Sequence, residues 1–135
     1  MEERTLVLIK PDAIEKDVWF EIIQIYLNEG LNVCKARILR MNKSLAAEFY
    51  KEHEWRSYFQ ELVRHMSSGP IVALIISGEN AIDRVRELNG ATTPAEAKEG
   101  TVRRLYGEPD SGPKNAVHGS DSKENAEREI MIIFE

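Results

Sequence analysis

Apolar and polar positions follow two different periods along the chain, and the short apolar runs predict strands. Residues 5–9 form a β-branched and aliphatic run that ends at Lys10 and Pro11, because proline lacks the backbone donor that a central strand requires. Residues 31–41 mix apolar and basic positions with a change of phase, which is typical of a half-exposed strand. The continuous apolar run 71–76 predicts a central strand buried on both faces, and residues 130–134 predict a final strand.

Apolar positions at helical spacing predict the elements between these strands. The predicted helices cover residues 18–28, 45–51, 58–66, 80–89 and 123–129. Ser44 and Asn80 are expected to cap two of these helices, because their side-chain oxygens accept from a first-turn N–H. Residues 89–118 are rich in glycine and proline and predict a long irregular segment, of a kind that is usually functional when ordered.

The order of these elements predicts the fold class. It is a βαβ unit, then two helices, then a second βαβ unit, which favours an α+β fold. We expect a ferredoxin-like α/β sandwich with a four-stranded antiparallel sheet covered by helices. A chain of 135 residues fits a single domain over residues 1–135.

Composition and charge narrow the classes of function. The chain is 42% hydrophobic and 30% charged, as ordinary globular domains are. Its net charge of -5 argues against nucleic-acid binding, which draws on a broad basic surface. The apolar runs are far shorter than the ~20 residues that span a bilayer. The single cysteine, Cys34, lies in an apolar-rich segment and predicts a small core residue. We therefore expect a cytoplasmic protein with no membrane or nucleic-acid partner.

The histidines are the first candidates for chemistry. His118 stands in a polar segment before a predicted helix and is a candidate nucleophile, because neutral imidazole is abundant near its ordinary pKa of roughly 6.5. Local context alone favours a merely solvated loop histidine at this position. His53 lies in a charged run and is assigned to solvent exposure, and His65 lies in an amphipathic helix and is assigned to boundary packing. Basic residues are scattered along the chain and would suit a small polyanion if the fold gathered them.

Four motifs in register resemble the nucleoside diphosphate kinase family. Residues 115–122, Asn-Ala-Val-His-Gly-Ser-Asp-Ser, resemble the active-site signature of that family. The other three motifs lie upstream in the family's order, at residues 3–12, 68–70 and 100–103. A lone His-Gly-Ser would be weak, but four motifs along nearly the whole chain are highly specific.

The resemblance implies a phosphotransferase with ping-pong chemistry and low base selectivity. His118 would take the γ-phosphoryl group of a nucleoside triphosphate such as ATP, become phosphohistidine, and pass the group to a nucleoside diphosphate. Glu129 would accept a hydrogen bond from the other ring nitrogen of His118, and Ser120 would support Glu129, although a helix cap would use the same hydroxyl. Lys10 and Tyr50 complete the catalytic positions.

The resemblance also implies a nucleotide site. Tyr58 would stack on the base, where the family usually carries phenylalanine, because stacking needs only a π-face. The matching nucleotide-binding positions are Lys10, Arg56, Tyr58, Leu62, Arg86, Thr92, Arg103, Asn115 and Gly119. Mg²⁺ would arrive on the nucleotide phosphates without a direct protein ligand, with Asp121 reaching it through water.

The remaining implications concern partners and departures from the family. We expect nucleoside di- and triphosphates as partners and a homo-oligomer built from dimers, with a hexamer favoured over a tetramer. Trp19 and Phe20 stand where the family carries small residues and are expected to alter a subunit contact. Residues 107–113 form a longer segment than in common members, and the chain ends at Glu135 without the family's C-terminal tail, which is expected to weaken the oligomer.

Two other functions compete with the kinase. One is a non-catalytic nucleotide-binding or interaction module on the same fold, which would have no need to retain the catalytic and phosphate-binding positions. The other is a ferredoxin-like regulatory domain that binds a small metabolite, which would have no need for the His118 segment.

Overall fold

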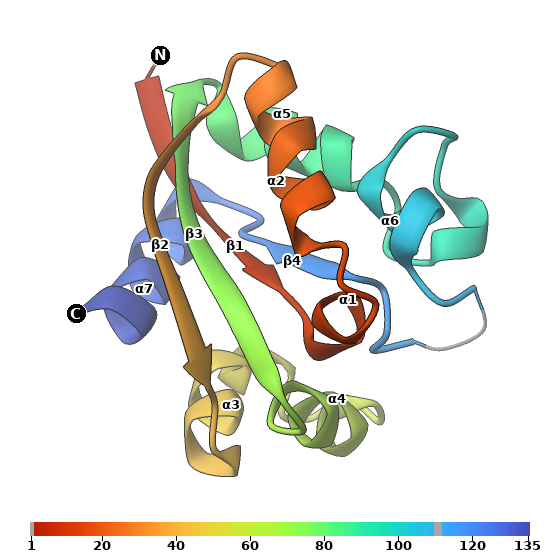
Figure 1. Cartoon of the computed structure of the whole chain (residues 1–135). Coiled ribbons are helices and arrows are strands. Elements are labelled where there is room, and N and C mark those ends of the chain that lie inside the picture. The colour runs from red at the N-terminus through yellow and green to blue at the C-terminus, as the bar shows by residue number, and fades with distance from the viewer. Residues whose placement is uncertain (1, 110–111) are drawn as a thin grey trace.

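The strands form one antiparallel sheet. The computed structural model describes residues 2–109 and 112–135. Within these residues the strand order is β2-β3-β1-β4, as Figure 1 shows. The strands are β1 (Glu2–Ile9), β2 (Asn32–Arg40), β3 (Pro70–Glu79) and β4 (Val117–Gly119). Together with the helices between them, they confirm the predicted α+β fold with a four-stranded antiparallel sheet.

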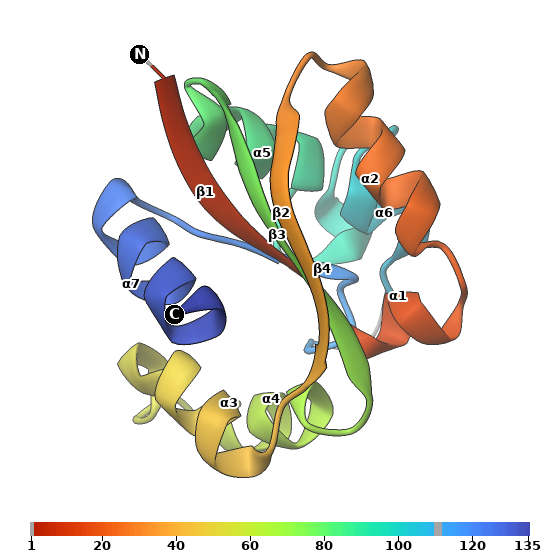
Figure 2. The ribbon, with the colours of Figure 1, turned by 60° about the vertical axis from the view of Figure 1, so that its left-hand side comes forward.

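Helices cover both faces of this sheet. They are α1 (Pro11–Glu15), α2 (Trp19–Asn28), α3 (Lys43–Phe49), α4 (Phe59–Met66), α5 (Ala81–Asn89), α6 (Val102–Tyr106) and α7 (Lys123–Phe134). Two single 3₁₀ turns, η1 (Lys51–His53) and η2 (Pro94–Glu96), join some of them. Figure 2 shows α2 and α5 on one side of the sheet, and α7 with the α3–α4 pair on the other.

The two central strands are buried on both faces. Side chains alternate along a strand, so Leu6 and Leu8 of β1 pack in the core beneath α3, α4 and α7. Val7 and Ile9 pack on the opposite side, in the core beneath α2 and α5. Residues 71–76 of β3 divide between the same two cores, which confirms the predicted central strand.

The predicted final strand over residues 130–134 is wrong. These residues are the last turns of α7, where Ile130 and Ile133 are buried at helical spacing and Met131 is exposed. A short apolar run fits a buried strand and a helix face equally well. The Ser122 side chain accepts from the Asn125 N–H (3.1 Å) and starts the helix as predicted. The fourth strand is instead β4, so His118 lies on an edge strand and not in a loop.

Several local predictions also differ from the structure. Asn42, and not Ser44, caps α3, because its Oδ1 accepts from the Leu45 N–H (2.8 Å). Asn80 occupies the cap position of α5 in the left-handed conformation (φ 53°) and makes no side-chain cap bond. Cys34 is exposed beside the register shift between Val33 and Lys35, because a bulge changes which residues face the core.

Candidate active site

A cleft of about 1380 Å³ gathers most of the predicted site residues from distant parts of the chain. Those that line it are Lys10, Tyr50, Tyr58, Leu62, Arg86, Thr92, Arg103, Asn115, His118, Gly119, Asp121 and Glu129. They come from the end of β1, the α3–α4 region, α5, α6, β4 and α7. The sheet register brings His118 here, because β4 pairs with β1 and sets His118 opposite Leu8.

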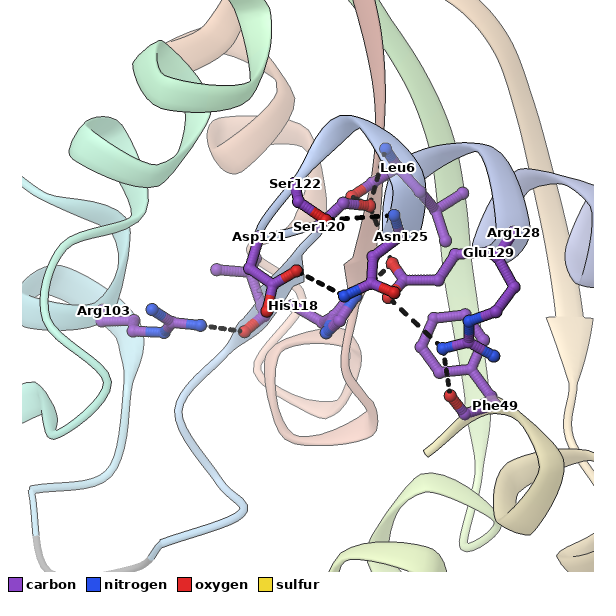
Figure 3. Close-up of polar contacts among 11 residues, drawn as sticks. Leu6, Phe49, Arg103, His118, Ser120, Asp121, Ser122, Asn125, Arg128 and Glu129 are labelled. Carbon is purple, nitrogen blue, oxygen red and sulfur yellow. Dashed lines mark hydrogen bonds and ion pairs between the residues drawn. The ribbon is translucent and has the colours of Figure 1, made fainter. Parts of the chain in front are cut away.

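His118 and Glu129 form a hydrogen-bonded pair at the floor of the cleft. His118 Nε2 lies 2.8 Å from Glu129 Oε1, and the two side chains are 18% and 6% exposed. The Ser120 hydroxyl donates to the same oxygen (2.7 Å). Ser120 is fully buried behind the pair and also lies 3.3 Å from the Leu6 backbone nitrogen. Figure 3 shows Glu129 extending from α7 toward His118 beside this serine.

The pair fixes which ring nitrogen of His118 is free. A carboxylate only accepts hydrogen bonds, so Nε2 carries the proton and Nδ1 keeps its lone pair. Within the described residues Nδ1 makes no hydrogen bond. His118 therefore presents an unprotonated nitrogen to the cleft, as a nucleophile requires.

Two aromatic rings hold the imidazole in place. Phe49 and Tyr50 meet the His118 ring edge to face, with centroid distances of 5.1 Å and 5.7 Å. The Tyr50 hydroxyl is buried and has no hydrogen-bond partner in the described chain. Burial, and then the charge of Glu129, raise the pKa of Tyr50, so the phenol stays protonated. A buried hydroxyl without a partner suits a ligand acceptor.

Two cations, the buried Lys10 and the partly buried Arg103, bring positive charge to this end of the cleft. Arg103 from α6 donates to Gly90 O (2.8 Å) and Val117 O (2.9 Å), and its Nε has no partner among the described residues. Figure 3 shows this guanidinium reaching the strand that carries His118. Burial lowers the pKa of Arg103, yet a guanidinium keeps its charge in proteins.

Lys10 donates to Asn115 Oδ1 (2.8 Å) and Pro113 O (3.2 Å). Burial, and then the charge of Arg103, lower the pKa of Lys10 to about 7, against an opposing effect of Asp12.

The outer residues of the cleft are more exposed. Asn115 Nδ2 donates to Thr92 O (2.9 Å), so the amide joins Lys10 to the segment after α5. Arg86 is exposed, as its position on α5 predicts. Hydrogen bonds from Asn125 and Ser122, together with the charge of Arg86, lower the pKa of Asp121.

The rim of the cleft carries the predicted base-stacking residue. Tyr58 is 44% exposed, and its hydroxyl lies 3.3 Å from His53 Nδ1. Leu62 lies deeper and is buried.

Arg56 is the one predicted nucleotide-binding position that does not line the described cleft. Its guanidinium instead lies 4.3 Å from the centroid of the Trp55 ring. The longer segment predicted at 107–113 falls partly outside the described residues, because residues 110 and 111 are not among them.

A buried carboxylate that sequence reasoning did not assign supports the segment before His118. Asp12 Oδ2 accepts from the Ala116 N–H (3.0 Å), and Asp12 Oδ1 lies 2.9 Å from His65 Nε2. Ala116 has a φ of +76°, which costs a residue with a side chain on the order of 1–3 kcal/mol. Boundary packing is therefore an incomplete account of His65, which is paired with Asp12. Only the place of Asp12 in the Lys10-Pro11-Asp12 motif hinted at a role.

The described residues offer no protein cage for a metal. They contain no group of three or more His, Cys, Asp and Glu side chains placed to hold an ion. No helix within residues 2–109 and 112–135 is long and apolar enough to cross a membrane.

Comparison with known proteins identifies one family. The family model of nucleoside diphosphate kinases matches residues 3–135. A curated nucleoside diphosphate kinase from Nitratiruptor sp. is 48% identical over 132 residues, which cover 98% of this chain and 95% of that protein. One from Chlamydia trachomatis is also 48% identical, with 98% and 92% covered. The crystal structure of the Aquifex aeolicus nucleoside diphosphate kinase superposes with a TM-score of 0.96 at 43% identity, covering 100% of this chain and 96% of that one. The enzyme from Encephalitozoon cuniculi gives 0.93 at 36% identity, covering 98% and 88%.

Proposed function

Because the chain belongs to the nucleoside diphosphate kinase family and is therefore a phosphotransferase, we propose that it carries the γ-phosphoryl group of a nucleoside triphosphate such as ATP on His118. The group then passes to a nucleoside diphosphate. One observation carries the proposal: Nε2 of His118 is bound to a buried carboxylate, while Nδ1 faces a cleft that Lys10 and Arg103 make positive.

Each half-reaction moves one phosphoryl group. The Nδ1 lone pair attacks the γ-phosphorus, the N–P bond forms, the bond to the bridging oxygen breaks, and a nucleoside diphosphate leaves. The ring keeps its Nε2 proton and gains positive charge, which the Glu129 carboxylate balances across 2.8 Å. The second half-reaction reverses these steps with a different nucleoside diphosphate.

Cations and one hydroxyl would stabilise the moving group. Phosphoryl transfer leaves the protein little covalent work beyond the nucleophile, so fixed positive charge and in-line placement carry catalysis. We assign this work to Lys10, Arg103 and the unpartnered Tyr50 hydroxyl, with Arg86 and Thr92 at the outer phosphates and Gly119 beside them. Arg56 stays a prediction, since reaching the phosphates would require its guanidinium to leave Trp55.

The nucleoside would lie at the rim, with the base on Tyr58, Leu62 at its edge and Asn115 near the sugar. We expect Tyr58→Ala to weaken nucleotide binding by about tenfold, because stacking on an aromatic ring contributes ~1–3 kcal/mol per base. The rate of phosphoryl transfer at saturating nucleotide should change less. Equilibrium binding and single-turnover kinetics measure the two effects, and Tyr58→Phe is the control that keeps the ring. Unchanged affinity in Tyr58→Ala would remove Tyr58 from the base slot. Stacking without contacts to the base edge would give low base selectivity.

The pKa of Lys10 predicts how nucleotide affinity depends on pH. In the free enzyme Lys10 has a pKa of about 7 instead of 10.5, and a bound phosphate should raise it again. Above pH 7 binding then takes up a proton, so affinity should fall with rising pH by up to about tenfold per unit. Calorimetry in two buffers of different ionisation enthalpy counts these protons. Lys10→Arg is the control, because its charge does not titrate; an equal pH slope in both proteins would contradict the prediction.

The lowered pKa of Lys10 also makes the stability of the fold depend on pH. Between about pH 7 and 10.5 the unfolded chain binds more protons at Lys10 than the folded chain does. The contribution of Lys10 to the free energy of unfolding therefore rises with pH through this window and is flat below it.

Family membership points to a divalent cation, and we propose that this is Mg²⁺. The described residues fit an ion that arrives with the nucleotide, because they provide no cage, and we expect the exposed Asp121, which lines the cleft, to reach the ion through water. When bound, the ion would neutralise phosphate charge.

We further propose one domain over residues 1–135, a cytoplasmic location and a homo-oligomer built from dimers, with a hexamer favoured over a tetramer. Trp19 and the exposed Phe20 form an edge-to-face pair on α2, which fits an altered subunit contact. A light-scattering mass distinguishes the assemblies.

Labelling with γ-labelled ATP tests the proposed function. We expect an acid-labile, alkali-stable phosphoprotein whose label moves to added GDP or dTDP. A protein that takes no label would favour the non-catalytic module.

A further inference from the structure

We propose that His65 is a positioning residue for phosphoryl transfer, which acts through Asp12 on the strained turn that leads into His118. This inference rests on the proposed role of His118 as nucleophile. His65 itself lies outside the set of residues that line the cleft.

The turn before His118 is closed by its own backbone. The Val117 N–H donates to Asn115 O (2.9 Å), which forms a three-residue turn centred on Ala116. Ala116 is fully buried and has a φ of +76°, a conformation that residues with a side chain rarely adopt. Surrounding contacts must therefore hold it.

Both backbone groups of Ala116 are held from the β1–α1 junction. The Lys10 N–H donates to Ala116 O (2.9 Å), and Asp12 Oδ2 accepts from the Ala116 N–H (3.0 Å). The residues on either side of Ala116 each bind one of the two cations of the site. Asn115 Oδ1 accepts from Lys10 Nζ, and Val117 O accepts from Arg103. A shift of the turn would thus move His118, Lys10 and Arg103 relative to one another.

His65 holds the second oxygen of Asp12. His65 Nε2 lies 2.9 Å from Asp12 Oδ1, and the two side chains are 9% and 4% exposed. His65 stands on the last turn of α4, so the pair joins α4 to the β1–α1 junction and, through it, to the turn. Without a partner at position 65, the buried Asp12 oxygen would lose its hydrogen bond, and the carboxylate would turn or take up a proton. Either change weakens its bond to Ala116.

Two substitutions at position 65 test this role. His65→Phe removes the hydrogen bond and keeps a ring, and His65→Gln keeps a side-chain N–H that can reach Asp12. We expect His65→Phe to slow labelling of His118 about tenfold in single turnovers, since small misplacements of reacting groups have effects of this size or larger. Nucleotide affinity should fall less than this rate, because no nucleotide contact is removed and in-line transfer is more sensitive to small displacements than binding is. His65→Gln should recover most of the rate.

The controls separate this inference from the proposed function. Arg64→Ala, at the neighbouring exposed position of α4, should label like the wild type. If phenylalanine prevents folding, His65→Ala takes its place with the same result expected. A wild-type rate in the Phe or Ala variant, or a failure of His65→Gln to recover the rate, would overturn the positioning role. A wild-type enzyme that takes no label would instead overturn the proposed function.

Discussion

The His118→Gly variant is expected to form no phosphoprotein and to transfer phosphate to GDP more slowly by a factor on the order of 10⁴ or more. In the proposed mechanism the enzyme holds the phosphoryl group while two nucleotides occupy the site in turn. His118 Nδ1 is the nitrogen that the Glu129 contact leaves free for this purpose. Acid-labile label on the protein and transfer to GDP are the two measurements.

His53→Gly is the matched control, because His53 also lines the cleft. Its ring stands at the rim with Nδ1 next to the Tyr58 hydroxyl, and no buried carboxylate orients it in the described structure. The His53 variant should therefore keep its label, with at most a weaker nucleotide affinity through Tyr58. Equal label on His118→Gly and on the wild type would assign the phosphoryl group to another residue.

Two of the strands that the sequence pattern predicted correctly have a clear boundary at a proline. The run 71–76 is too short for an independent helix and is bounded by Gly69-Pro70, so only a buried strand fitted it. Residues 130–134 lacked such a boundary. They continue a helix that Ser122 starts, and only tertiary packing decides that Ile130 and Ile133 face the core.

Sequence motifs pointed to candidate site residues that the fold brings into one cleft, but they did not point to contacts that depend on pairing across the fold. The family resemblance pointed to His118 and Ser120 in one motif and to Glu129 further along the chain, and the structure brings all three together. The Asp12–His65 contact joins residues 53 positions apart, and neither residue has a sequence neighbour that indicates it. Arg56 matches a family position in sequence, but that match did not predict that its guanidinium would lie over the Trp55 ring.

Substituting Glu129 should separate the charge of the carboxylate from its role in orienting the ring. In Glu129→Gln the side-chain oxygen can take the place of Oε1 and accept from both Ser120 and His118, so that Nε2 keeps its proton. Only the negative charge is lost. Hydrogen bonds to charged groups contribute about 1–2 kcal/mol more than neutral ones, so we expect His118 to be phosphorylated about tenfold more slowly.

Glu129→Ala should slow the phosphorylation of His118 far more, on the order of 10³-fold. It removes the charge and also leaves the His118 ring free to turn or change tautomer. Single-turnover labelling of the two variants measures the ratio, and thermal unfolding shows whether each is folded. A loss in Glu129→Gln as large as that in Glu129→Ala would mean that charge alone matters. A wild-type rate in Glu129→Gln would mean that the ring needs orientation but no balancing charge as the N–P bond forms. The proposed mechanism requires both effects, and therefore requires the glutamine variant to fall between the wild type and the alanine variant.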